Sequence, residues 1–163
     1  MKVVVNATPL IGLSLLNRLD LLPELFEEVI VPRAVYEEVV VQGGSRVGAA
    51  VLSSAAWVQV KEPNRAPTIE PLLLGLDAGE LQVLLLACDL QPDWVLVDER
   101  LGRRVAHVLR LPVKGTVGVL LAAFHARLLT KTEALEAVRH LREQGFRISP
   151  AVVAWFEQEL EQA

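Results

Sequence analysis

The stretch that decides the class of fold is Val3-Val4-Val5-Asn6-Ala7-Thr8-Pro9-Leu10, close to the amino terminus. Its consecutive valines predict a short β-strand buried on both faces, since β-branched side chains favour a pleated and covered sheet. Thr8 followed by Pro9 predicts the start of a helix, with the threonine as cap and the proline at the first helical position. One polar side chain, Asn6, therefore stands between a buried strand and a helix.

Short apolar runs and longer helical patterns alternate through the rest of the chain. Further strands are expected at 29–31, 57–60, 94–97 and 111–113, and further helices at 32–41, 47–54, 77–89, 101–108, 116–127, 131–144 and 149–161. Strands separated by helices indicate βαβ units, and so an α/β fold with a central parallel sheet of about five strands. Helices on both faces of that sheet make a three-layer α/β/α sandwich. The clear loop at 61–71 is too short to divide the chain, so residues 1–163 are expected to form a single domain.

Composition narrows the class of function. The chain has 163 residues, of which 52% are hydrophobic and 22% charged, so it can bury a sizeable core and is not a disordered chain. Its single cysteine, Cys88, excludes an intrachain disulfide and fits a reducing compartment. Neither a signal peptide nor an apolar run of about 18 residues is present, so a cytoplasmic protein without a membrane span is expected.

The net charge of −4, from 16 basic and 20 acidic residues, argues against a protein that binds nucleic acid by bulk charge. It does not exclude an enzyme that cuts nucleic acid, because a bound metal ion can supply positive charge locally.

Polar residues at strand ends are the first candidates for chemistry, since ligands bind outside the carboxyl ends of parallel strands. Asn6 follows the first strand and Asp98 follows the strand at 94–97, while Glu38 and Glu80 lie on helices. As a set, they are the hard oxygen ligands that magnesium and manganese prefer. Such an ion can activate water and stabilise the leaving oxygen in phosphodiester cleavage.

Each of these residues also has a purely structural interpretation. Asn6 could bond the backbone of a turn, and Asp98 could cap the helix that follows it. Asp77 and Glu80 have the spacing of a capping box, and Glu38 could be a solvated helix residue. Spacing alone does not decide whether the four side chains meet.

The order and spacing of several segments are similar to those of a known family. The opening stretch and the later ones together resemble the PIN-like superfamily, in particular an uncharacterised prokaryotic branch related to VapC-type toxin ribonucleases. The resemblance covers nearly the whole chain, and its later segments are Val31–Val39, Leu76–Glu80, Val97–Arg100 with Arg103–Ala106, Leu111–Thr116 and Gly145–Ser149.

The resemblance implies a parallel sheet whose acidic residues hold Mg²⁺ or Mn²⁺ and cleave RNA. By position, the family's four acids fall on Asn6, Glu38, Glu80 and Asp98, with Glu37 as the fallback for Glu38. Asn6 departs from the commoner aspartate, because its amide oxygen can ligate a metal but brings no charge. We therefore expect this chain to hold a divalent ion more weakly than four carboxylates would.

Auxiliary residues are also implied by the resemblance. Thr8 and Thr116 match hydroxyl positions near the family's site, although both could equally be helix caps. Arg100, Arg103 and Arg104 could contact phosphate, but for Arg103 an exposed ion pair with Glu99, four residues away on the helix, is favoured.

The leading functional hypothesis is a metal-dependent endoribonuclease, the toxin component of a toxin–antitoxin pair, with an RNA substrate and an antitoxin partner. The alternative is a catalytically degenerate PIN-like module that binds a protein partner or RNA without cleavage, which the neutral Asn6 favours. Another phosphoryl-handling α/β enzyme ranks third, because the chain lacks a phosphate-binding glycine loop and an acid pair after its first strand. The richness in apolar residues also predicts an exposed patch that serves a homodimer or an antitoxin.

Overall fold

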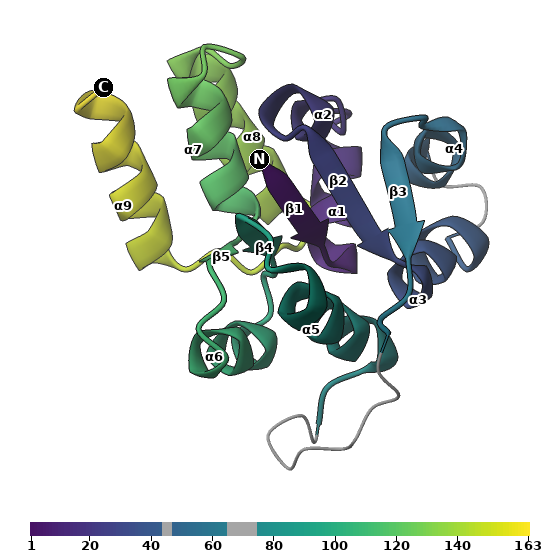
Figure 1. Ribbon diagram of the computed structural model, residues 1–163. Helices are drawn as coiled ribbons and strands as arrows, with labels where there is room; N and C mark the ends of the chain where they lie inside the picture. Colours follow the sequence, from purple (N-terminus) through teal and green to yellow (C-terminus); the bar gives the residue numbers. More distant parts are fainter. Residues whose placement is uncertain (44–46, 65–74) are drawn as a thin grey trace.

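The computed structural model describes residues 1–43, 47–64 and 75–163, and its strands form one parallel sheet in the order β3-β2-β1-β4-β5 (Figure 1). Every neighbouring pair of strands runs parallel. The predicted central parallel sheet of about five strands is thereby confirmed. The strands are β1 (Lys2–Val5), β2 (Glu28–Pro32), β3 (Val58–Lys61), β4 (Trp94–Leu96) and β5 (Val113–Lys114).

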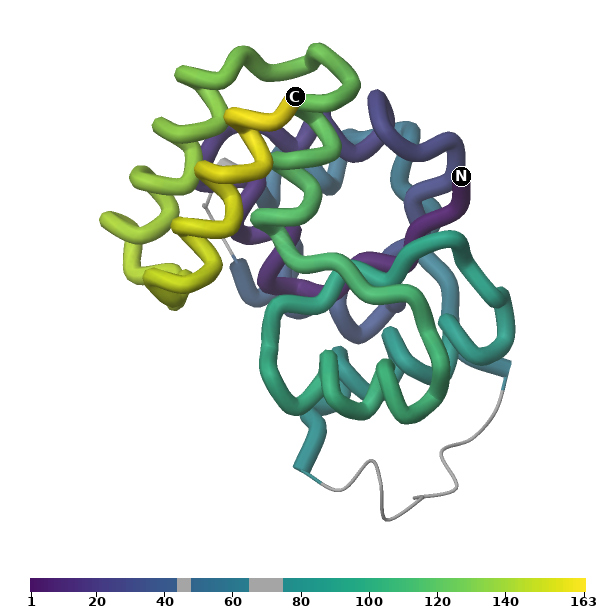
Figure 2. Tube along the Cα trace, turned by 90° about the vertical axis from the view of Figure 1, so that its left-hand side faces the viewer, coloured from purple at the N-terminus to yellow at the C-terminus, as the bar shows by residue number. Residues whose placement is uncertain are grey.

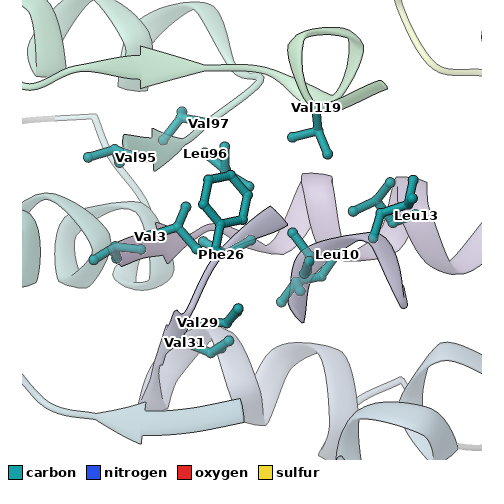
Figure 3. Close-up of a cluster of buried hydrophobic side chains, with 14 of the residues drawn as sticks. Val3, Leu10, Leu13, Phe26, Val29, Val31, Val95, Leu96, Val97 and Val119 are labelled. Carbon is teal, nitrogen blue, oxygen red and sulfur yellow. The ribbon is translucent and has the colours of Figure 1, made fainter. Parts of the chain in front are cut away.

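The central strands are buried because both faces of the sheet are covered. Consecutive residues of β1 point to opposite faces, yet Val3, Val4 and Val5 are all inaccessible to solvent. Val3 pairs with Val29 of β2, and Val4 with Val95 of β4. Figure 3 shows strand valines and leucines packed with Leu10 and Leu13 of the first helix and Val119 of a later one.

Two layers of helices enclose the sheet (Figure 1). One face is covered by α1, α2 and α7, with α8 and α9 outside them, and the other by α5 and α6. Figure 2 shows α8 and α9 together, well apart from α5 and α6. This arrangement confirms the three-layer sandwich. The bounds are α1 (Ala7–Leu15), α2 (Leu21–Leu25), α3 (Arg33–Tyr36), α4 (Val47–Ser54), α5 (Ala78–Leu90), α6 (Arg100–Val108), α7 (Thr116–His125), α8 (Lys131–Glu143) and α9 (Pro150–Glu161).

Most of the predicted elements are present, with differences at their ends. The helix expected at 32–41 is α3 followed by a π-helical turn, Glu37–Val41, and α2 was not expected at all. Strand β5 lies slightly later than the expected 111–113. Of the expected loop, residues 65–71 lie outside the described residues.

Three interpretations of helix caps are wrong. Asn6, not Thr8, is the N-cap residue of α1, and Glu99, not Asp98, is that of α6. Gly115, not Thr116, is the N-cap residue of α7. The predicted capping box at Asp77 and the Ser149 cap of α9 are confirmed.

The sheet has a switch point between β1 and β4. The chain goes from β1 outward to β2 and β3, then crosses to β4 and β5 on the other side of β1. It leaves β1 into α1 on one face and β4 into α6 on the other (Figure 1). Ligands of open α/β sheets bind at this point, outside the carboxyl ends of the strands.

Within the described ranges, no helix combines the length and the apolar character that crossing a bilayer requires.

Candidate active site

Asn6 lies at the switch point and turns its side chain toward an acid that follows β4. Its backbone N–H donates to the carbonyl of Leu96 at 3.0 Å, and only 3% of the residue is exposed. Although Asn6 occupies the N-cap position, its side chain makes no capping bond. Pro9, at the third helical position, has no N–H to offer. The amide Nδ2 of Asn6 instead donates to Glu99 Oε2 at 3.2 Å.

Thr8 completes the contact with Glu99. Its hydroxyl donates to Glu99 Oε1, so each oxygen of that carboxylate accepts a bond from the first residues after β1. The predicted ion pair between Glu99 and Arg103 is wrong. Arg103 is half-buried, and its Nη1 donates to the carbonyl of Val97 at 3.1 Å.

Asp98 is held by the amino terminus of α7. The backbone N–H of Thr116 donates to Oδ1 at 2.8 Å and its hydroxyl to Oδ2 at 2.6 Å. The N–H is free for this bond because Thr116 is the first residue of α7, where the backbone N–H has no partner within the helix. Burial nevertheless raises the pKa of Asp98 above its ordinary value, and the bonds from Thr116 offset only part of that effect.

Asn6 and Thr116 share a property that sets them apart. In the part of the chain that the structure describes, they are the only polar side chains that are buried, at 3% and 1% exposed. Each donates a hydrogen bond to an acid at the switch point, Asn6 to Glu99 and Thr116 to Asp98. The fold therefore buries polar groups where they restrain carboxylates.

Glu80 has a structural and a site-facing oxygen. Its Oε2 accepts from the Asp77 N–H at 3.0 Å within the capping box. Its Oε1 faces α6, since a Cβ placed on Gly102 would lie 3.8 Å from it. Burial raises the pKa of Glu80, and repulsion from Asp77, Glu99 and Glu38 adds to the rise despite the opposing backbone bond.

Glu38 reaches the same region from the π-helical turn. Its Oε2 lies 3.3 Å from where a Cβ on Gly79 would stand, at the first turn of α5. Partial desolvation raises the pKa of Glu38, and the charges of Asp77 and Glu99 raise it further. Glu37 and Glu38 are both exposed, so exposure does not separate them. Glu38 is the one whose carboxylate is observed against α5.

Glu99 and Asp77 belong to this cluster although the sequence did not single them out as candidates for it. Glu99 stands directly after Asp98, which was the available signal. None of Glu38, Glu80, Asp98 and Glu99 forms an ion pair with a residue in the described ranges. The nearby charge of Arg103 lowers the pKa of Asp98, but the effect of burial is larger.

The donor chemistry fits a hard divalent cation. All the donors are oxygens, and a cation would relieve the repulsion among the carboxylates. As the side chains stand, no three Asp, Glu, His or Cys groups of the described chain lie close enough to share one ion. Side-chain rotation is therefore needed before Glu38, Glu80, Asp98 and Glu99 could ligate together.

Comparison with known families agrees with the fold. A family model described as PIN domain matches residues 2–162. The chain belongs to the PIN-domain family. The PIN domain is a nuclease fold, and PIN domains are generally dependent on divalent metal ions. Searches of curated proteins and of solved structures give no match.

The auxiliary residues that were expected near the site of this PIN domain fall into two groups. Thr8 and Thr116 both contact site acids, and Thr8 lies inside the first turn of α1 and does not cap it. Arg100 and Arg104 are exposed on α6, which begins immediately after Glu99.

Proposed function

We propose that this PIN domain is a Mg²⁺- or Mn²⁺-dependent endoribonuclease that hydrolyses RNA, and that it serves as the toxin of a toxin–antitoxin pair in the cytoplasm. The observation that carries the proposal is the set of carboxylates without an ion pair around the switch point, Glu38, Glu80, Asp98 and Glu99. They come from three segments of the chain, and burial or mutual repulsion raises the pKa of Glu38, Glu80 and Asp98. Repulsion among carboxylates destabilises the folded state unless a bound cation neutralises part of their charge.

Glu80 and Asp98 would hold the cation, with the amide oxygen of Asn6 as a neutral ligand. When bound, the ion would lower the pKa of water and neutralise charge on the phosphate. Thr116 keeps Asp98 fixed through two bonds, so the carboxylate loses little freedom on binding.

Glu38 is the most accessible of these acids, and its raised pKa makes its carboxylate the better proton acceptor. We assign it as the base that takes a proton from the attacking water. The water oxygen bonds to phosphorus, and the bond from phosphorus to the leaving ribose oxygen breaks. That oxygen takes up a proton from solvent water, and Glu38 releases the proton it accepted.

Arg100 and Arg104 supply the positive charge that the chain as a whole lacks. They are four residues apart on one face of α6, exposed, and in no ion pair with a described residue. We assign them to the phosphates of the RNA next to the cleaved bond.

The decisive experiment compares RNA cleavage by the wild type and by Asp98→Asn. Wild type should cleave with Mn²⁺ and stop in excess EDTA, and the variant should lose about 100-fold or more in rate while keeping its circular dichroism and melting temperature. An Asp98→Asn variant as fast as wild type would sink this mechanism.

A non-catalytic binding module is the second candidate. Asn6 supports it, because a neutral residue replaces a charged ligand and the Glu99 oxygens are already bonded. Titration with Mn²⁺ separates the two functions, since the module should show no binding at millimolar concentrations.

We further propose that the domain forms a homodimer or binds its antitoxin through α1, the π-helical turn and α4. Leu15, Val41 and Val51 are exposed on these three elements, which contact one another. A monomeric mass in solution, unchanged by a co-expressed partner, would contradict this assignment.

A further inference from the structure

Residue 6 of this PIN domain is a neutral asparagine, where an aspartate would add a negative charge for holding a cation. The carboxylate of Glu99 is bonded to the amide of Asn6. We propose that Glu99 supplies the missing carboxylate, and that Asn6 and Thr8 are positioning residues that hold it toward the metal. This inference rests on the proposed metal-dependent function.

The two bonds to Glu99 define the arrangement. Asn6 Nδ2 lies 3.2 Å from Oε2, and the Thr8 hydroxyl donates to Oε1, although the residues are 93 and 91 positions apart in the chain. They meet because β1 and β4 are neighbours in the sheet, with Val5 paired to Leu96. Asn6 directly follows the last residue of β1, and Glu99 lies shortly after the end of β4, so both residues stand at the same edge of the sheet.

An amide at position 6 suits this contact and a carboxylate does not. An aspartate there has no N–H to donate, and its oxygens would face those of Glu99 with no described cation paired to either acid. The amide of Asn6 can donate to the carboxylate of Glu99, so the two residues are chemically matched. The switch point then has as many carboxylates as it would with an aspartate at position 6 and no acid at position 99.

The electrostatics place Glu99 among the other acids. Its charge contributes to the raised pKa of Asp98, of Glu80 and of Glu38, and no other acid acts on all three. A carboxylate that repels each of three others lies where a shared cation would relieve the most repulsion.

The ordinary structural roles of Glu99 do not account for its position. Its side chain makes no capping bond although the residue is the N-cap of α6. The cation four residues on, Arg103, donates to the Val97 carbonyl. What remains is a restrained carboxylate at the switch point.

The test exchanges the two groups and measures Mn²⁺ binding by calorimetry on the full chain, without RNA. Glu99→Gln should weaken Mn²⁺ binding by about tenfold or more. The double variant Asn6→Asp with Glu99→Gln restores one carboxylate and one amide in swapped positions, and should return to within about threefold of wild type. Glu24→Gln, which removes an exposed charge on α2, is the matched control and should bind like wild type.

The outcomes separate this inference from the function beneath it. Wild type that binds Mn²⁺ while Glu99→Gln binds equally well overturns the inference alone, as does a double variant no better than Glu99→Gln. Wild type that binds no Mn²⁺ overturns both proposals.

Thr8→Val tests the positioning role without changing Glu99, so the inference can still be tested if Glu99→Gln fails to fold. The variant keeps every charge and nearly the same side-chain volume. Loss of the hydroxyl should weaken Mn²⁺ binding by about tenfold, and Thr8→Ser should recover it. Wild-type affinity in Thr8→Val would remove the positioning role.

Discussion

At the scale of single residues, the site depends on helix termini that leave their usual bonds unmade. Asn6 caps α1 without a side-chain bond to the helix, and its amide donates to Glu99 instead. Thr116 is the first residue of α7, so its N–H has no partner within the helix and donates to Asp98. In both places a helix terminus leaves a polar group available to bond an acid.

Gly115 is needed for space as well. A Cβ there would lie 2.7 Å from Asp98 Oδ1 and 2.9 Å from Arg103 Nη1, so Gly115→Ala must move one of these side chains. Both atoms are side-chain ends and not backbone, so the fold should survive with a loss of about 1 kcal/mol. We expect Mn²⁺ affinity and RNA cleavage to fall by about tenfold.

Gly118→Ala is the control for that variant on the same helix. Its Cβ would lie 3.5 Å or more from the Lys114 side chain, which is ordinary contact, and cleavage should stay at the wild-type level. Equal activity of Gly115→Ala and Gly118→Ala would contradict the requirement for space beside Asp98.

At the scale of elements, the π-helical turn and α6 bring the two sides of the site together. The N–H of Gln42 donates to the carbonyl of Glu37 at 3.0 Å, five residues back, which widens the turn and changes the phase of its side chains. Helix α6 starts at Arg100, directly after Glu99, and presents its arginines next to the acids.

The α6 arginines should govern RNA affinity. Each arginine would neutralise one phosphate, so the double variant Arg100→Ala with Arg104→Ala should weaken RNA binding. The slope of log K against log salt concentration should become less steep by about 2. Fluorescence anisotropy with labelled single-stranded RNA, over a series of salt concentrations, measures both effects.

Arg142→Ala with Arg147→Ala makes the same charge change elsewhere, at and beyond the end of α8. That pair should leave the salt dependence near its wild-type value. If the two double variants behave alike, α6 is not the RNA-binding face.

At the scale of the whole molecule, the strand order concentrates negative charge at one edge of the sheet. The acids at the switch point come from three different parts of the chain, and they repel one another in the folded state. In the absence of a cation, this repulsion lowers the free energy of unfolding.

The direction of the pH dependence follows from the raised pKa values. Between the ordinary and the raised pKa of Glu80, the folded chain holds more protons than the unfolded chain, so this group's contribution to stability falls as pH rises. Glu80→Gln removes the charge and keeps the capping box. It should be more stable than wild type by roughly 0.5 kcal/mol at pH about 7, after allowance for solvent screening, and show little difference at pH about 4.

Urea unfolding at the two pH values measures this difference, and Mn²⁺ provides a second comparison. A ligand that binds the folded state at about 100 times its Kd adds about 2.7 kcal/mol, so wild type should gain more from Mn²⁺ than Glu80→Gln does. A variant less stable than wild type at neutral pH would show that Glu80 acts mainly as a cap.

Much of the fold was predictable because its signals are local. Valine runs indicated buried strands, Asp77 and Ser149 marked helix starts, and alternation of strands and helices indicated the parallel sheet. Helix α2 was missed because it is a single short stretch between two better signals.

The sequence by itself determined the α/β architecture and the position of Asn6 at a strand end, since side-chain periodicity and strand ends are properties of neighbouring residues. Only the tertiary structure decided that Asn6 and Thr8 bond Glu99, that Thr116 bonds Asp98, and that Arg103 turns away from Glu99. These contacts depend on which strands are neighbours in the sheet. A switch of strand order joins residues more than ninety positions apart, and no local pattern carries that information.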